Sequence, residues 1–164
     1  MASMDLKNAV LTIEDGTSPT PNSITVVMGE GNLTWSEKKP RIYDKDRGRL
    51  DTVRNADEEP MEVQFAARWE YIKADTGDDA TIEDALKQRG EASDWVSSSA
   101  DTCEPYAVNL KFTFTPICSG DKEEIFLFPD FRYETLDHDA QAATISISGM
   151  CNAVEPTITR EEQA

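Results

Sequence analysis

Three segments of the chain alternate apolar and polar residues, and the longest of them runs from Met61 to Tyr71. Its odd positions are all apolar, and its even positions are polar apart from Ala66. Residues 108–114 and 143–151 repeat the pattern. Because successive side chains of a β-strand point to opposite faces, a period of two predicts strands with one buried and one solvated face. Half-solvated strands are typical of antiparallel sheets, so we expect the chain to be built around one.

Shorter runs predict the remaining strands, which we expect at residues 8–14, 23–29, 31–36 and 123–136. We predict that Gly29 and Gly31 mark a bulge or kink within one long strand, since glycine inside a strand pattern often does so. Ser119-Gly120-Asp121 has the composition of a turn. It is therefore predicted to close a hairpin between 106–118 and 123–129.

One short helix is predicted between residues 81 and 89. Thr81 and Asp84 have the spacing of a capping box, with Asp where Glu or Gln is usual. Ile82 and Leu86 form an apolar stripe that must pack on a sheet, and Gly90 predicts the end of the helix. The predicted fold class is therefore mainly β: an antiparallel β-sandwich or barrel with one short α-helix and a long hairpin or loop arm.

Charge is distributed very unevenly along this chain of 164 residues and net charge −16. Residues 38–54 contain seven of the 16 Lys and Arg against three Asp, a net charge of +4, whereas the remainder has 9 basic and 29 acidic residues and nets −20. So acidic a body disfavours binding to nucleic acid or anionic membranes. We expect a single domain over residues 1–164, with a flexible basic arm at 37–60 and a polar C-terminal arm at 155–164.

The basic segment also contains regularly placed apolar residues, namely Ile42, Tyr43, Leu50 and Val53. We predict an extended hairpin in which 40–44 pairs with 49–54 and Arg47-Gly48 forms the turn. A two-stranded hairpin has too little core to be stable alone, so it would order against a neighbour. The alternative is a solvated, mobile loop whose charge bias has no function.

No catalytic, metal or cofactor site is predicted. His138, the only histidine, lies in a polar stretch that we interpret as a solvated turn, and no G-x-S-x-G nucleophile motif accompanies it. Cys103, Cys118 and Cys151 are widely spaced, whereas structural zinc sites use close ligand pairs. The acidic runs lie in polar segments where carboxylates are ordinarily solvated, and no glycine-rich phosphate loop is present. We expect a protein that is not an enzyme.

The sequence contains no run of about 18 apolar residues, so we expect no membrane insertion by this chain. Its first residues, Met1–Lys7, lack the apolar stretch of a signal peptide. We therefore expect a protein that is made and used without secretion.

The order of these elements resembles the tail tube proteins of long-tailed, siphophage-like bacteriophages. The resemblance rests on a strand from Ser23 to Trp35, then Pro40-Arg41-Ile42-Tyr43-Asp44-Lys45-Asp46-Arg47-Gly48, and then the amphipathic strand from Met61 to Ile72. The short helix at 81–89, a closing strand Ile145-Ser146-Ile147-Ser148-Gly149 and a polar tail complete it. It covers most of the chain and depends on element order, not on a catalytic signature.

The resemblance implies a structural virion protein of the tail, made in the host cytoplasm. Its subunits would form hexameric rings that stack into a tube with a continuous inner β-barrel. Double-stranded DNA would pass through an acidic lumen without specific binding. The implied partners are further copies of the chain, the tape measure protein, the tail terminator and the tail tip. The three cysteines and the long 91–105 connection depart from the family pattern and leave a crosslink between subunits open.

Two groups of residues follow from the resemblance. The arm matches the family hairpin that reaches an adjacent subunit or ring, so the expected interface residues are Lys38, Lys39, Arg41, Tyr43, Lys45, Arg47, Arg49 and Arg54. The expected lumen residues are the acids of solvated strand faces: Glu62 and Glu70 first, then Glu30 and Glu134.

Two other functions stay open. One is a soluble β-sandwich binding module of the virion, at the tail tip or for a receptor or ligand, which would present an exposed aromatic patch. Its candidates are Trp35, Trp69 and Trp95; the alternation places Trp35 and Trp69 on buried faces, whereas Trp95 lies in a polar stretch. The other, less favoured, is a hydrolase with a carboxylate site.

Overall fold

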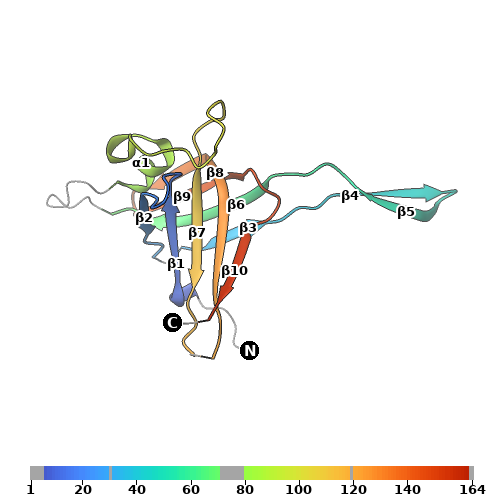
Figure 1. The fold of residues 1–164 in the computed structure, drawn as a ribbon, viewed down its shortest axis with the longest axis horizontal. Coiled ribbons are helices and arrows are strands. Elements are labelled where there is room, and N and C mark those ends of the chain that lie inside the picture. Colours follow the sequence, from blue (N-terminus) through green and yellow to red (C-terminus); the bar gives the residue numbers. More distant parts are fainter. Residues whose placement is uncertain (1–5, 30, 71–79, 119, 163–164) are drawn as a thin grey trace.

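The computed structural model describes residues 6–29, 31–70, 80–118 and 120–162, and they form a mainly β, antiparallel architecture (Figure 1). The predicted fold class is confirmed. The strands are β1 (Ala9–Glu14), β2 (Ser23–Val26), β3 (Leu33–Ser36), β4 (Arg41–Asp46), β5 (Arg49–Asn55), β6 (Met61–Arg68), β7 (Val108–Phe114), β8 (Glu123–Asp139), β9 (Thr144–Cys151) and β10 (Thr157–Glu161). In the described residues, α1 (Ile82–Lys87) is the one α-helix, and short 3-10 turns occupy Leu6–Asn8 and Gly90–Ala92.

The strands of the body follow the order β2-β1-β7-β8-β9-β6-β3, with β10 added on β8. β8 has 17 residues and serves two layers: its first half pairs with β7 and β10, and its second half pairs with β9. The sheet curls, and its two ends approach each other at the turn between β2 and β3, where the chain on both sides of the turn binds β6. Val27 O accepts a hydrogen bond from Arg68 N at 2.7 Å, and Asn32 O accepts one from Ala66 N at 3.1 Å.

The alternating segments supply the core between the two layers. Along β6, burial alternates as predicted, with Met61, Val63, Phe65 and Ala67 buried. The apolar positions of β7 and β9 face the same interior, as predicted, and β8 adds Phe128 and Phe131. The antiparallel pairing of β7 with β8 confirms the predicted hairpin, while Ser119 of its predicted turn lies outside the described residues.

The prediction of one kinked strand around Gly29 and Gly31 is wrong. β2 and β3 are separate strands at opposite ends of the sheet order, where β2 pairs with β1 and β3 pairs with β6. Gly31 N donates to Met28 O at 2.9 Å, and Gly29 has φ +61°. A hydrogen bond across three residues, combined with a left-handed residue, makes a tight turn instead of a bulge.

Helix α1 begins as predicted and ends differently. Thr81 and Asp84 form the reciprocal capping box, in which Thr81 Oγ1 accepts from Asp84 N at 3.2 Å. The helix ends at Lys87, and Gln88, with a left-handed φ of 54°, is its C-cap, so the prediction that Gly90 stops the helix is wrong. Leu86 packs in the core as expected.

The Thr81 cap provides a local stability test. Thr81→Ala removes an acceptor from the first turn, and we expect it to lower the free energy of unfolding by about 1 kcal/mol. Thr81→Ser keeps the hydroxyl and is the matched control, with an expected change of less than about 0.5 kcal/mol. Urea unfolding followed by circular dichroism measures both, and equal values for the two variants would contradict the capping role.

Three side chains differ from their expected surroundings. His138 lies in β8, not in a turn; its ring is 4.9 Å from that of Trp69, and its Nε2 contacts a Glu83 carboxylate oxygen. Trp69 was expected in the core but is 45% exposed, since it follows the last residue of β6 at the end of the sandwich. Trp95, by contrast, is buried.

The C-terminal segment, residues 155–164, was expected to form a polar arm. Within it, Thr157–Glu161 forms β10, which pairs with β8 in the register Thr157↔Leu127 to Glu161↔Glu123. All five side chains of β10 are exposed. This strand is therefore attached to the body mainly through its backbone hydrogen bonds.

Candidate functional site

The basic segment forms a β-hairpin that extends away from the body as an arm (Figure 1). β4 pairs with β5 in a two-stranded sheet that is separate from the body sheet. Arg47 and Gly48 have φ of 52° and 84°, so both turn residues are left-handed, as a type I′ hairpin turn requires. The hairpin and its turn were predicted from sequence, and the structure confirms them.

Contacts within the arm stabilise this hairpin. Tyr43 lies directly opposite Val53, and a bulge follows between Tyr43 and Lys45. At the bulge, Asp44 accepts a hydrogen bond from Thr52 Oγ1 at 3.2 Å and lies 3.6 Å from Arg54 Nε. Arg54 therefore has a partner inside the arm and is less available to another molecule.

The apolar residues of the arm remain exposed. Leu50 is 74% exposed, Tyr43 59% and Val53 57%. The body also exposes apolar side chains, among them Ile117, but these are scattered over separate segments, as is normal for a protein surface. In the arm they lie together on one short hairpin, and such a grouping marks an interaction surface.

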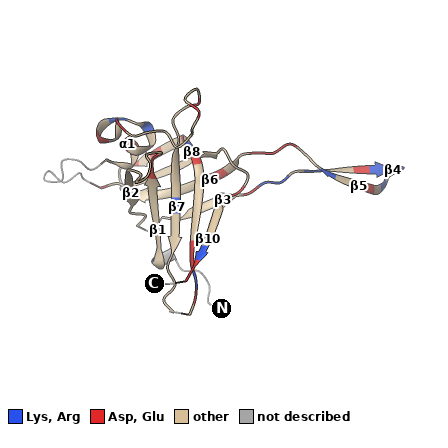
Figure 2. Cartoon of the chain, in the orientation of Figure 1, with Lys and Arg blue, Asp and Glu red and all other residues tan. Residues whose placement is uncertain are grey.

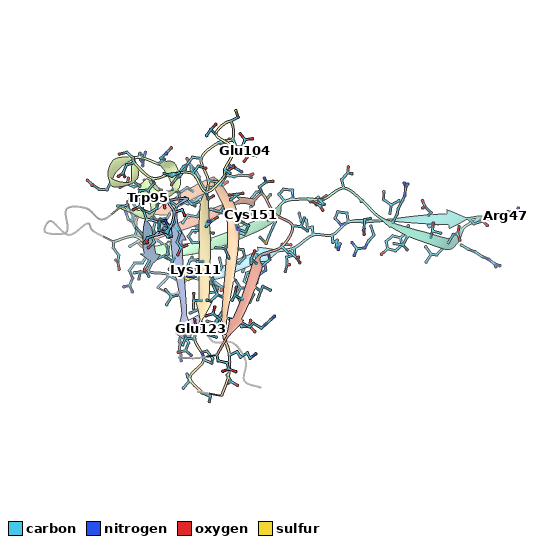
Figure 3. All side chains as sticks on the ribbon, in the orientation of Figure 1. Arg47, Trp95, Glu104, Lys111, Glu123 and Cys151 are labelled. Carbon is cyan, nitrogen blue, oxygen red and sulfur yellow. The ribbon has the colours of Figure 1, made fainter. Side chains whose placement is uncertain are left out.

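All eight predicted interface residues lie on or next to the arm and are exposed. Lys38 and Lys39 precede β4, and Arg41 begins it. Basic residues occur along the arm and at its end, with Arg47 at the tip (Figure 2, Figure 3). The structure thus gathers the sequence-predicted cations on one projecting element.

A second candidate surface is the outward face of the four strands β3, β6, β9 and β8. Cross-strand pairing aligns Thr34, Gln64, Ser148 and Thr135 in one row. The next row contains Ala66, Ser146 and Asp137, and these rows line a shallow groove. This face is therefore rich in hydroxyl groups, with acids toward its ends.

The predicted lumen residues are only partly gathered on this face. Glu62 lies on it and accepts a hydrogen bond from Gln64 Nε2 at 2.9 Å. Glu70 follows the end of β6 and lies 3.6 Å from Arg68. Glu134 is exposed in β8 at a shift in register, and Glu30 lies outside the described residues.

Sequence reasoning missed the hydroxyl residues of this face. Ser146 and Ser148 are the polar members of an alternating segment, and that signal could have identified them. Their alignment with Gln64 and Thr135 depends on strand pairing between distant segments, which the sequence does not display.

No cluster of three or more His, Cys, Asp or Glu side chains in the described residues is placed to hold a metal ion. Burial, with a smaller contribution from Asp130, raises the pKa of the Cys151 thiol to about 12, so the thiol stays protonated and behaves as a small apolar group. Cys103 and Cys118 are exposed. Across the described ranges, no helix is both long and apolar enough to cross a membrane.

No family model and no curated protein matches the sequence. The fold, however, is similar to that of two chains from an extracellular contractile injection system, PVC, both in the extended state. A chain of its sheath/tube terminator has a TM-score of 0.55 at 9% identity, covering 97% of this chain and 98% of that chain. A chain of its sheath-tube complex has a TM-score of 0.52 at 8% identity, covering 96% and 92%. At such identities the likeness establishes a shared fold.

Proposed function

We propose that this chain is a structural subunit of a tail tube, which assembles into hexameric rings that stack around a channel for DNA. The observation that carries the proposal is the projecting β4–β5 hairpin, whose apolar and cationic residues are exposed in the single chain. A surface of that kind needs a partner to cover it. The likeness to components of a tube-containing injection system supports the same role.

The four-stranded layer β3-β6-β9-β8 is the candidate wall of the channel. Its outward face combines hydroxyl groups with Glu62 and Asp137. Such a surface offers few cations to DNA phosphates, so DNA would pass without sticking. In this proposal the chain acts without catalysis, metal or cofactor.

The proposed location is the tail of a siphophage-like virion, after synthesis in the host cytoplasm. The tape measure protein, the tail terminator and the tail tip would be its partners there. The likeness to a sheath/tube terminator favours a second candidate, a ring that closes the end of a tube and does not polymerise. Electron microscopy distinguishes the two, because a tube subunit forms filaments of uniform width and a terminator forms single rings.

A soluble aromatic binding module is less well supported. Trp35 packs against Phe126 and Phe128, and Trp95 is buried. Trp69 is the one tryptophan exposed above a third in the described residues, and a single ring makes a small patch.

The arm can be tested by reversing its charge. We expect Arg47→Glu with Arg49→Glu to slow polymerisation of the purified protein at least about tenfold at low salt, since complementary charges accelerate encounter. The matched control reverses Lys87 and Lys111, which lie on the body, and should assemble at the wild-type rate. Light scattering gives the rates, and electron microscopy identifies the product.

Two results would contradict this account. Wild-type protein that stays monomeric at high concentration and at every salt tested would contradict the tube function. Normal assembly of the arm variant would leave the tube function standing and remove the electrostatic role of the arm.

A further inference from the structure

One side of the body has two strand edges without strand partners among the described residues. β3 pairs with β6 alone, and β10 pairs with β8 alone, so each leaves its other edge uncovered. Both strands lie on the side of the body from which the arm departs (Figure 1). An exposed edge presents backbone N–H and C=O groups to an added strand.

Apolar side chains line the space between these edges. Ile158 of β10 lies directly opposite Phe126 of β8, so the two side chains share the inner face. The ring of Trp35, from β3 in the facing layer, is 5.3 Å from that of Phe126. Ile158 is nevertheless 42% exposed. The core is therefore open along this side, with Trp35, Phe126 and Ile158 at its rim.

The same side carries unbalanced negative charge. Glu161 lies directly opposite Glu123, and like charges in that arrangement destabilise a strand pair. The neighbouring Glu124 has a cationic partner, because Arg160 Nε donates to it at 3.1 Å, whereas Glu123 accepts a hydrogen bond from the neutral Thr115 Oγ1 at 3.2 Å. Figure 3 places Glu123 near one end of the body. A basic side chain brought to Glu123 and Glu161 would relieve their repulsion.

We propose that this open side receives the arm of a second copy of the chain. The inference rests on the tube function proposed above and assigns the surface of the body that the arm contacts. The occupant must supply a strand edge, exposed apolar groups and positive charge. The arm has all three. Its two strands have outer edges without a strand partner among the described residues, Leu50 and Tyr43 are exposed apolar groups, and Lys45 and Arg47 lie toward its tip.

The dimensions of the arm fit this partner. From residue 37 to Arg47 the extended chain rises about 33 Å. A compact domain of this length has a radius of gyration of about 15 Å, so the arm can reach across a neighbouring body. It extends away from its own body, so the receiving edges belong to another copy (Figure 1).

In the docked state, a strand of the arm adds to the edge of β10. Leu50 then covers Ile158 and Trp35, and Arg47 or Lys45 neutralises the Glu123–Glu161 pair. Backbone hydrogen bonds provide attachment, and the apolar and charged contacts select the partner.

Disulfide trapping tests the assignment. Chains with Leu50→Cys are mixed with chains with Ile158→Cys, both carrying Cys103→Ser and Cys118→Ser, and oxidised under assembly conditions. We expect a covalent dimer on a non-reducing gel, at least about fivefold more abundant than with the control Val10→Cys. Val10 is 48% exposed, close to Ile158, but belongs to β1.

A charge exchange gives a second, independent readout. Glu161→Lys alone should slow assembly, and combining it with Arg47→Glu in the same chain should restore at least half of the lost rate. Assembly that proceeds normally, without the dimer and without rescue, would overturn the docking site and leave the tube function intact. If the wild-type chain forms neither rings nor tubes, the tube function and the docking site both fail.

Discussion

Replacing Gly149 with alanine is expected to lower the free energy of unfolding by about 3 kcal/mol or more. A Cβ atom at this position would lie 2.1 Å from Arg132 O and 2.9 Å from the ring of Phe131. Gly149 sits in β9 opposite Val63 on one side and Tyr133 on the other. Neither neighbour can withdraw without breaking backbone pairing, so the substitution must displace a central strand.

Gly120→Ala is the matched control, because a Cβ there meets no atom within 4 Å. We expect that control to change stability by less than about 0.5 kcal/mol. Urea unfolding followed by circular dichroism compares the two. A Gly149→Ala protein within about 1 kcal/mol of wild type would show that β8 and β9 can separate freely, contrary to this packing.

Asp15→Ala is expected to destabilise the fold by a similar amount, about 3 kcal/mol, because several donors lose a buried acceptor. Asp15 is 2% exposed and accepts five hydrogen bonds. Two come from Thr17 at 3.0 and 2.7 Å, two from Asn22 at 2.8 Å, and one from Val96 N at 3.2 Å. One carboxylate thus fixes the loop after β1 to a segment 81 residues later in the chain.

The same carboxylate predicts a pH dependence. Burial opposes its ionisation, but the hydrogen bonds from Thr17, Asn22 and Val96 outweigh burial, and the pKa of Asp15 lies below its ordinary value. A lowered folded-state pKa means that the stabilisation is complete above the unfolded value of about 3.9 and is lost as pH falls through the folded one.

Asp15→Asn separates charge from shape. At pH 7 it should be less stable than wild type, and the difference in unfolding free energy should shrink as the pH falls below about 4. Urea unfolding between pH 7 and pH 2 measures that difference. A difference that stays constant down to pH 2 would assign the effect to shape instead of ionisation.

The strands of the body were predictable because their signal is local. Alternation along residues 61–67 and 108–112 matches the observed burial. The same rule failed at Trp69, since alternation indicates a side of a strand but not where the facing layer ends. It also missed the turn between β2 and β3, because the two strands have different partners: β2 pairs with the preceding strand β1, whereas β3 pairs with the more remote β6.

The candidate site also has one part that the local sequence predicted and parts that depend on contacts between distant segments. The arm was predictable because the turn residues Arg47 and Gly48 and the flanking apolar residues all lie within one short segment. The face proposed as the wall of a channel was not predictable, because reasoning from charge selected Glu62 and Glu70 and overlooked the aligned hydroxyl groups. The open side at β3 and β10 depends on which strands fail to pair, and only the folded chain reveals that.

Strand β8 has a mechanical consequence. The 17 residues of β8 belong to both layers. A force applied to β6 and β9 is therefore transmitted to β7 through the covalent backbone of β8. The layers cannot slide past each other as two separately connected sheets could. Each body should therefore respond to load as a stiff block. In the proposed tube, bending and twisting would then be taken up between copies, and the arms would set how flexible the filament is.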